Sequence, residues 1–320
     1  MNKKIAFLFP GQGAQYPGMA KDFFDHFAEA REVFDESDDV LGVKFSALIF
    51  NGPASELTLT KNSQLGIYIA STAILRTVEN QFPDLTPSVC AGLSLGEYTA
   101  LLAAGKISFA EGLKLVEARA QYMNNACAAH PGTMQVVLGL EPSAVEEVLK
   151  KLNPPHQVWI ANLNCPGQVV IAGSQSGIDA AVEPLKAKGA KRVLPLDVSG
   201  AFHSGLMQEA QSLLEPKIQE TQFIDSPVQL VMNVTGSYVT DVDQIKQNLI
   251  LQVTSPVRWE QGIRSMMQAG VEIYVEMGCG KTLQGMNKRI GVPQPTLSIE
   301  KISDLETLSQ MEIDHAAIKR

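Results

Sequence analysis

The chain alternates short apolar runs with longer segments in which apolar residues recur every three or four positions. The run Ile5-Ala6-Phe7-Leu8-Phe9 is uninterrupted, which predicts a strand buried on both faces. Residues 62–80 are apolar on most faces of a helix, so we expect a buried helix there. Another strand precedes Ser94, and residues 109–129 have the period of a long helix. This alternation predicts an α/β fold with a largely parallel sheet covered on both faces.

Residues 130–197 have a different pattern. Strands are expected at 133–140, 158–161, 169–172 and 192–196, with helices at 142–152 and 176–187. The order β-α-β-β-α-β is the ferredoxin-like pattern. We therefore predict an inserted ferredoxin-like subdomain over 130–197 and a discontinuous, α/β-hydrolase-like main domain over 1–129 and 198–320.

Composition narrows the class of protein. With 320 residues, 45% hydrophobic and 19% charged, the chain can bury a large core. A formal charge of -8 argues against a nucleic-acid partner. The first apolar run stops at Pro10, too short for a signal peptide, and no run approaches the roughly 18 residues of a membrane span. We expect a cytoplasmic protein with no membrane partner.

The cysteines give no sign of a metal site. Four of them are scattered without C-x-x-C spacing, at Cys90, Cys127, Cys165 and Cys279. We expect reduced, mostly buried thiols, no metal and no cofactor.

The pentapeptide Gly92-Leu93-Ser94-Leu95-Gly96 fits G-x-S-x-G between a predicted strand and a predicted helix. In that context a sharp turn exposes the serine oxygen as a nucleophile. Serine is also a preferred residue at a helix N-cap. The pentapeptide by itself leaves both interpretations open.

A serine nucleophile needs a base, and the chain has five histidines. His203 lies in a Ser/Gly-rich loop where the chain re-enters the main domain, a position typical of catalytic side chains. A structural role for it is the alternative. The others lie in an early helix, beside prolines or in the tail: His26, His130, His156 and His315. The nearest candidate acid to orient the base is Asp197.

Arg119 is out of place on its predicted helix. Its neighbours one turn away are Leu115, Val116, Tyr122 and Met123, so its guanidinium lies on an apolar face. A buried arginine needs an anion or another acceptor. It either forms an internal salt bridge, donates to carbonyl groups, or waits for a substrate carboxylate that its planar fork can bind through two bonds.

Two glycine-rich segments are weaker signals. "PGQGAQ", residues 10–15, lets backbone N–H groups approach a ligand or an oxyanion, but it lacks the G-x-G-x-x-G pattern of a dinucleotide site. "GCGKT", residues 278–282, ends like a P-loop. The first glycine of that motif would fall at Val275, so we expect a tight turn before a helix and no nucleotide site.

Seven segments, taken in order, carry a resemblance: "FPGQGAQYPGM", "GLSLGEYTAL", "EARAQYM", "ANLNCPGQVVIAG", "FHSGLM", "QVTSPVRW" and "GCGKTLQGMNKRI". Together they resemble the malonyl-CoA:acyl-carrier-protein transacylases, which are related to the acyltransferase domains of polyketide synthases. The resemblance implies a ping-pong transfer of malonyl from malonyl-CoA, through a malonyl-serine, to the phosphopantetheine thiol of an acyl carrier protein in fatty-acid biosynthesis. It also implies a monomer.

The resemblance assigns roles to single residues. Ser94 is the nucleophile and His203 its base, later the acid that protonates the leaving thiolate. The backbone N–H groups of Gln12 and Leu95 form the oxyanion hole. Arg119 pairs with the malonyl carboxylate.

Three further residues match the family's substrate site. The main-chain carbonyl of Gln252, in place of an aspartate, orients the histidine, while Met123 and Asn162 line the acyl pocket. Two positions depart from the usual pattern: Leu93 stands where many members have histidine, and Cys279 replaces a proline-containing turn.

The carrier partner is expected to be acidic. Two basic clusters are candidate docking surfaces or ordinary solvated faces: Lys281, Lys288 and Arg289, and Lys191 with Arg192. Three other functions stay open: a serine thioesterase or hydrolase, a stand-alone acyltransferase of a polyketide pathway, and a non-catalytic carrier-docking protein.

Overall fold

A computed structural model describes residues 3–152 and 157–310. Its larger sheet has six strands in the order β10-β9-β1-β2-β7-β8. All neighbours pair in parallel except β7 and β8. The strands are β1 (Ile5–Phe9), β2 (Val89–Gly92), β7 (Gln229–Met232), β8 (Ser237–Val239), β9 (Ile273–Met277) and β10 (Thr296–Ile299).

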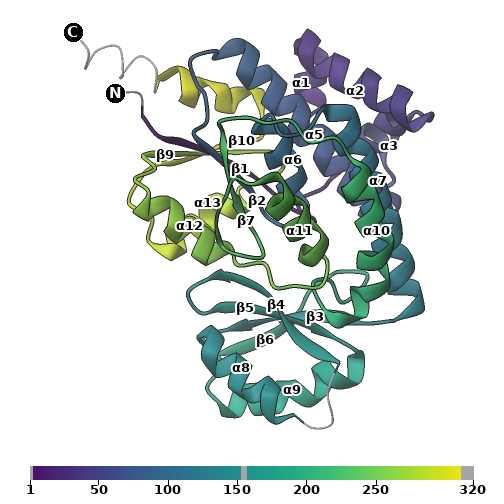
Figure 1. Ribbon diagram of the computed structural model, residues 1–320, viewed down its shortest axis with the longest axis vertical. Coiled ribbons are helices and arrows are strands. Elements are labelled where there is room, and N and C mark those ends of the chain that lie inside the picture. The colour runs from purple at the N-terminus through teal and green to yellow at the C-terminus, as the bar shows by residue number, and fades with distance from the viewer. Residues whose placement is uncertain (1–2, 153–156, 311–320) are drawn as a thin grey trace.

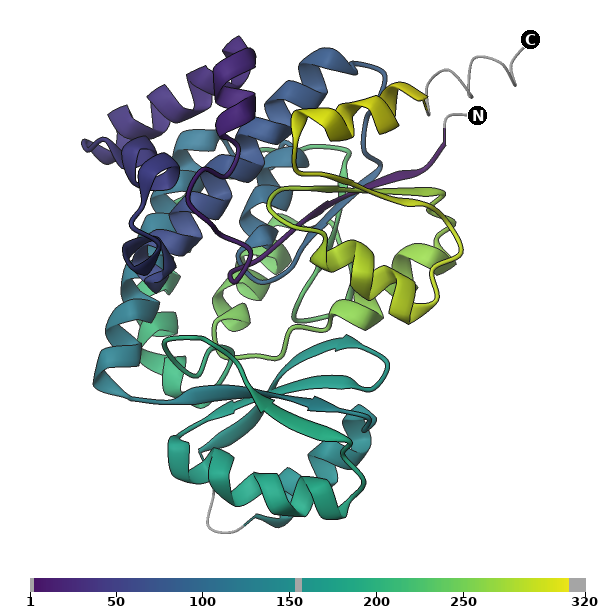
Figure 2. The same cartoon turned by 180° about the vertical axis from the view of Figure 1, so that it is seen from behind.

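Both faces of this sheet are covered, as the continuous apolar strand requires. Ile5, Phe7 and Phe9 belong to a core with the helices of one layer, among them α2, α5, α6 and α7. The side chains that alternate with them, Ala6 and Leu8, pack against α12 and α13 on the other face. Figures 1 and 2 show the two layers from opposite sides.

The helices of these layers are α1 (Lys21–His26), α2 (Ala28–Leu41), α3 (Phe45–Asn51), α4 (Ala54–Thr58), α5 (Thr60–Gln81), α6 (Gly96–Ala103), α7 (Phe109–Ala129), α10 (Gln208–Glu220), α11 (Val242–Gln252), α12 (Trp259–Gln268) and α13 (Thr282–Ile290). Short 3-10 helices lie at Gly205–Met207 and Ile302–Asp304. No helix in the described part of the chain combines the length and hydropathy that a bilayer crossing requires.

A second, antiparallel sheet has the order β4-β5-β3-β6. Its elements are β3 (Thr133–Leu138), α8 (Pro142–Lys151), β4 (Val158–Cys165), β5 (Gln168–Gly173), α9 (Gln175–Ala187) and β6 (Arg192–Pro195). Helices α8 and α9 cover the face that points away from the larger sheet (Figure 1). The opposite face contributes Met134, Val136 and Val170 to the main core.

The predicted α/β class and the β-α-β-β-α-β order are confirmed. The expected end of one strand at residue 161 is wrong, because β4 continues to Cys165. Asn162 and Asn164 interrupt the apolar pattern of this strand, and asparagine is depleted in strands. The pairing of β4 with β5 is also irregular there. The division into domains at 129/130 and 197/198 stays a prediction.

The carboxyl ends of β1 and β2 meet at one edge of the sheet, and glycine allows their turns to touch. A Cβ built on Gly96 would lie 2.1 Å from the Phe9 carbonyl oxygen, and one on Gly11 would lie 2.4 Å from that of Leu93. Both atoms are backbone and cannot move aside cheaply. The two turns are therefore held in direct contact.

We predict that Gly96→Ala lowers the free energy of unfolding by about 1–3 kcal/mol, the usual cost of overpacking. Gly285→Ala is the matched control, because a Cβ there meets nothing within 4 Å inside α13. That change should raise the free energy of unfolding by about 0.5–1 kcal/mol. Urea denaturation measures both. Equal effects of the two substitutions would contradict the close contact.

Candidate active site

Ser94 lies in a sharp turn between β2 and α6. Its φ is 52°, in the left-handed region that few residues other than glycine adopt. A Cβ built on Gly92 would lie 1.9 Å from the backbone carbon of Gly96, so both glycines of G-x-S-x-G are required by this geometry. The strand-turn-helix context of a nucleophile elbow is present.

The helix-cap interpretation of Ser94 does not hold. Helix α6 begins at Gly96, its N-cap residue is Leu95, and no side chain caps it. The serine Oγ instead lies 2.7 Å from Nε2 of His203 and accepts a hydrogen bond of 3.1 Å from Nη2 of Arg119. Three residues far apart in the sequence therefore meet at one oxygen atom.

His203 has its two ring nitrogens in different settings. Nδ1 lies 2.8 Å from the main-chain carbonyl oxygen of Gln252, and only a protonated Nδ1 can donate to it. Nε2 is then the unprotonated nitrogen and accepts from the Ser94 hydroxyl. Asp197 is exposed in a loop, so among the residues that the structure describes a carbonyl group, and no carboxylate, accepts from this histidine.

The setting of His203 favours its neutral form. The side chain is buried, and burial together with the positive charge of Arg119 lowers the imidazole pKa to about 4. Its φ of 56° is also in the left-handed region. Of the other histidines, His26 bonds to a carbonyl of its own helix and His130 is exposed near a glutamate, while His156 and His315 lie outside the described residues.

Arg119 is 1% exposed, and its partners are neutral oxygens. Nη1 donates to Oε1 of Gln64 at 2.5 Å, and Nη2 donates to Oε1 of Gln252 at 2.9 Å as well as to Ser94. No ion pair among the described residues includes it. Burial lowers the guanidinium pKa. The alternative of an internal salt bridge therefore fails in this part of the chain, and the carbonyl groups that accept from Arg119 are those of side-chain amides.

Of the two residues expected to line the acyl pocket, Met123 lies beside Arg119 and Asn162 has no hydrogen bond to this cluster in the described part of the chain. Sδ of Met123 accepts a 3.6 Å hydrogen bond from Nε2 of Gln64, which places it beside Arg119. Asn162 is half-buried on β4, at an isolated bridge to Val257, and no hydrogen bond connects it to this cluster. Its place in an acyl pocket stays a prediction.

The two expected oxyanion-hole amides lie on the two touching turns. Gln12 follows β1, and its side chain contacts Thr60 at 3.4 Å. Leu95 directly follows the serine. In the described structure, no hydrogen bond joins the backbone N–H of either residue to another protein group. Both donors are therefore available to a ligand.

Sequence reasoning missed three buried polar side chains near Ser94: Gln64, Glu97 and Asn233. Gln64 and Glu97 belong to helices whose other buried positions are mostly apolar, and this misfit is the signal that could have found them. Asn233 carries no such signal, because it follows a short strand in a polar turn.

The segment that resembles a P-loop cannot bind phosphate in the usual way. The carboxylate of Glu276 accepts the backbone N–H groups of Leu283 and Gln284 at 2.9 Å each. These are the amides that a phosphate would need at this helix N-terminus. The expectation of a plain turn before α13 is consistent with this arrangement.

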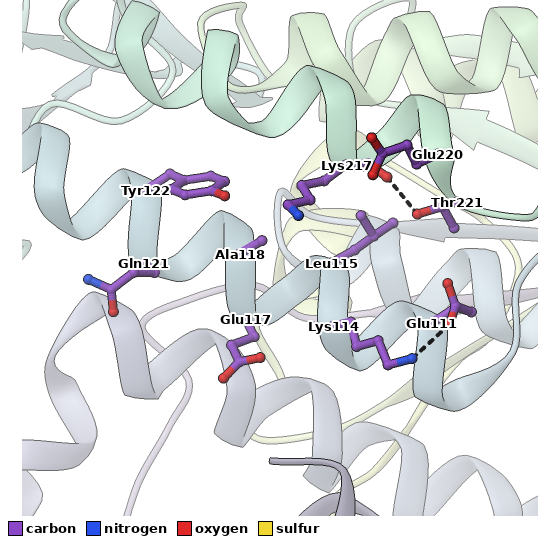
Figure 3. A pocket seen from close by; sticks show the side chains of 10 residues that line it. All are labelled: Glu111, Lys114, Leu115, Glu117, Ala118, Gln121, Tyr122, Lys217, Glu220 and Thr221. Atoms are coloured by element: carbon purple, nitrogen blue, oxygen red, sulfur yellow. Dashed lines mark hydrogen bonds and ion pairs between the residues drawn. The ribbon is translucent and has the colours of Figure 1, made fainter. Parts of the chain in front are cut away.

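A hollow of about 610 Å³ lies between α7 and α10 (Figure 3). Its lining mixes charges of both signs, including a Lys114–Glu111 pair of 3.1 Å. None of Ser94, His203 and Arg119 lines it. The hollow is therefore separate from the cluster around the serine oxygen.

No group of three or more possible metal ligands occurs within the described ranges. The four cysteines are free and buried. Of the basic clusters, Lys281 lies 3.6 Å from Asp304, and Arg289 donates to Gln168 at the start of β5. Leu138 of β3 pairs with Gln168 on one side and with Arg192 on the other. Arg192 and Gln168 therefore lie at the same end of the antiparallel sheet. The docking role of the basic clusters stays a prediction.

Comparison with known proteins gives a consistent result. The acyl transferase domain model matches residues 6–318. The malonyl CoA-acyl carrier protein transacylase of Bacillus subtilis is 42% identical over 95% of this chain and 95% of its own length, and that of Haemophilus influenzae is 37% identical over 96% and 99%.

Solved structures agree with these relatives. The malonyl CoA-acyl carrier protein transacylase of Clostridium perfringens has a TM-score of 0.94 at 37% identity, over 99% of this chain and 100% of that one. A malonyl-transacylase solved with a type II polyketide acyl-carrier protein has a TM-score of 0.91 at 36% identity, over 95% and 98%. The chain belongs to the acyl transferase family and is an acyltransferase.

Proposed function

We propose that this enzyme transfers the malonyl group from malonyl-CoA to the phosphopantetheine thiol of an acyl carrier protein in fatty-acid biosynthesis. The observation that carries the proposal is the guanidinium of Arg119, which is buried 3.1 Å from the Ser94 Oγ, donates to neutral oxygens and forms no ion pair among the described residues. The names of the relatives support the same substrate and acceptor.

In the first half-reaction, neutral His203 takes the hydroxyl proton of Ser94 through Nε2 as Oγ attacks the thioester carbonyl carbon. Negative charge develops on the carbonyl oxygen, which the backbone N–H groups of Gln12 and Leu95 stabilise. The C–S bond then breaks, and the imidazolium returns its proton to the departing CoA thiolate. A malonyl-serine ester and neutral histidine remain.

Arg119 selects the acyl group. The free carboxylate of malonyl offers two oxygens to the two terminal nitrogens, whose present partners are amide and hydroxyl oxygens. A two-pronged pair in which both the guanidinium and the carboxylate are charged is stronger in a buried site than bonds from the guanidinium to neutral oxygens. An acetyl group lacks the carboxylate and leaves the guanidinium as it is.

The second half-reaction reverses the first with a different thiol. His203 takes the proton of the phosphopantetheine thiol, the thiolate attacks the ester carbonyl, and the Ser94 alkoxide leaves and recovers the proton. Attack by water at this stage would make the protein a thioesterase. A polyketide carrier is a second candidate acceptor, favoured by the similar structure solved with one. The cytoplasmic location and the monomer stay predictions.

The decisive experiment combines purified protein with malonyl-CoA, with and without a carrier protein. Intact-mass spectrometry should detect a malonyl adduct on wild type and none on Ser94→Ala, because the ester forms on that oxygen. The adduct should then move to the carrier. An unlabelled wild type would favour a docking protein, and rapid hydrolysis unaffected by the carrier would favour a thioesterase.

We predict that Arg119→Ala lowers kcat/KM for malonyl-CoA by about 30-fold to several thousand-fold, which corresponds to the roughly 2–5 kcal/mol lost when one partner of a buried charge pair is truncated. Transfer of acetyl should fall far less, because it makes no carboxylate contact. Lys114→Ala, an exposed position on the same helix, is the control. Equal losses for both acyl groups would contradict the role of Arg119.

The pH profile tests His203. Its lowered pKa of about 4 keeps the imidazole neutral, and able to accept a proton, across the range where an ordinary histidine becomes protonated. The value of kcat/KM for malonyl-CoA should therefore stay level as pH falls through 6.5, the ordinary pKa, and decline only toward pH 4. Circular dichroism at each pH separates this decline from acid unfolding. A half-maximal point near pH 6.5 would contradict the assignment.

A further inference from the structure

Two buried side chains with no role in the mechanism above enclose the turn that carries Ser94. Glu97 is 1% exposed and Asn233 is 3% exposed. Glu97 belongs to α6, one turn after the serine. Asn233 directly follows β7, the strand that neighbours β2 in the sheet. Burying such groups is costly unless every bond they can make is satisfied, so their contacts are informative.

Asn233 bridges the two sides of the nucleophile turn. Its Oδ1 accepts the backbone N–H of Ser94 at 2.7 Å, and its Nδ2 donates to the carbonyl oxygen of Gly92, also at 2.7 Å. One side-chain amide therefore fixes the peptide groups before and after Leu93. These bonds hold the left-handed backbone of Ser94, whose strain the local sequence does not relieve.

Glu97 holds Asn233 and Gln252 together. Its Oε1 accepts the backbone N–H of Asn233 at 2.6 Å, and its Oε2 accepts from Nε2 of Gln252 at 2.6 Å. Both oxygens act as acceptors, which is the arrangement of an ionised carboxylate. Burial raises the pKa of this carboxyl to about 8, and the two N–H donors and nearby Arg119, which favour the ionised form, offset that rise only in part.

This contact sets the direction of the Gln252 amide. With Nε2 turned toward Glu97 and toward the carbonyl of Ser94 at 2.9 Å, Oε1 faces the guanidinium of Arg119. The reversed amide would present its NH2 group to the guanidinium, donor against donor. No hydrogen bond among the described residues joins Glu97 to Arg119 directly, and the hydrogen-bonded path between them runs through Gln252.

We propose that Asn233 and Glu97 are positioning residues with separable tasks: Asn233 holds the nucleophile, and Glu97 holds the Gln252 amide in the direction that orients Arg119. The proposal rests on the proposed function for its second half only. Neither residue touches the reacting atoms. Their loss should therefore change different steps.

Asn233→Ala removes both bonds to the turn and should misplace Ser94 alone. Transfer of malonyl and of acetyl should fall together, by about 10²-fold for a displacement of about 1 Å. Modification of Ser94 by phenylmethanesulfonyl fluoride should slow by a similar factor, since it needs the same activated oxygen. If the alanine variant does not fold, Asn233→Asp gives the same test, because its second oxygen would face the Gly92 carbonyl.

Glu97→Gln is nearly isosteric and should act on the amide of Gln252. The backbone N–H of Asn233 can only donate, so the new amide must turn its oxygen there and its NH2 toward residue 252. The Gln252 amide then meets a donor where it had an acceptor, and either reversal toward Arg119 or a shift away from residue 97 displaces the oxygen that orients Arg119. We expect KM for malonyl-CoA to rise and kcat/KM to fall by about 10²-fold, with a smaller loss for acetyl-CoA.

Glu276→Gln is the matched control, because Glu276 is also buried and accepts two backbone N–H groups, but at α13. Rates are corrected for the folded fraction at the assay temperature, measured by circular dichroism. Variants of Asn233 and Glu97 that lose no more activity than Glu276→Gln would overturn the proposal. So would identical malonyl-to-acetyl ratios in both. If wild type transfers no malonyl, the proposed function fails, while the Ser94 modification rates still test Asn233.

Discussion

The buried cation of Arg119 is the constraint on which the rest of the site depends. A guanidinium that is 1% exposed must find acceptors inside the protein, and it finds the amide oxygens of Gln64 and Gln252. When the side-chain oxygen of Gln252 faces the guanidinium, the Nε2 of Gln252 points the other way and donates to Glu97 and to the Ser94 carbonyl. Because these partners are neutral oxygens, the guanidinium has no ion pair among the described residues, and this is the feature on which its proposed role in selecting the acyl group rests.

A second constraint is backbone strain at Ser94 and His203. Ser94 and His203 both have positive φ, which costs on the order of 1–3 kcal/mol for each such residue. The cost is offset by side-chain amides and carbonyl groups that hold both residues from outside their own segments. Short, strained turns give the serine oxygen and the imidazole a fixed separation, which a relaxed loop would not. The two glycines beside Ser94 make this approach of backbones possible.

The two sheets contribute in different ways. The parallel sheet brings the carboxyl ends of β1, β2 and β7 together, and from these ends come Gln12, Ser94 and Asn233. The antiparallel sheet shares its inner face with the main core, while α8 and α9 cover its outer face. Helix α7 runs between these regions (Figure 1) and carries Arg119. The position of α7, together with the turn after β2, thus sets the 3.1 Å distance between the Arg119 guanidinium and the Ser94 Oγ.

The sequence by itself determined the elements, because their apolar periods are local: the bounds of α7 agree at both ends, and β4 was missed only where two asparagines interrupt its pattern. It also singled out Ser94 by its G-x-S-x-G pentapeptide, His203 by its Ser/Gly-rich loop and the need for a base, and Arg119 by its charge on an apolar helix face. Only the tertiary structure decided that these three meet at one oxygen atom, that Asp197 lies exposed in a loop, and that Gln64, Glu97 and Asn233 complete the network. Hydrogen bonds between residues more than 100 positions apart leave no periodic signal along the chain, because they depend on how strands and helices pack after each has formed.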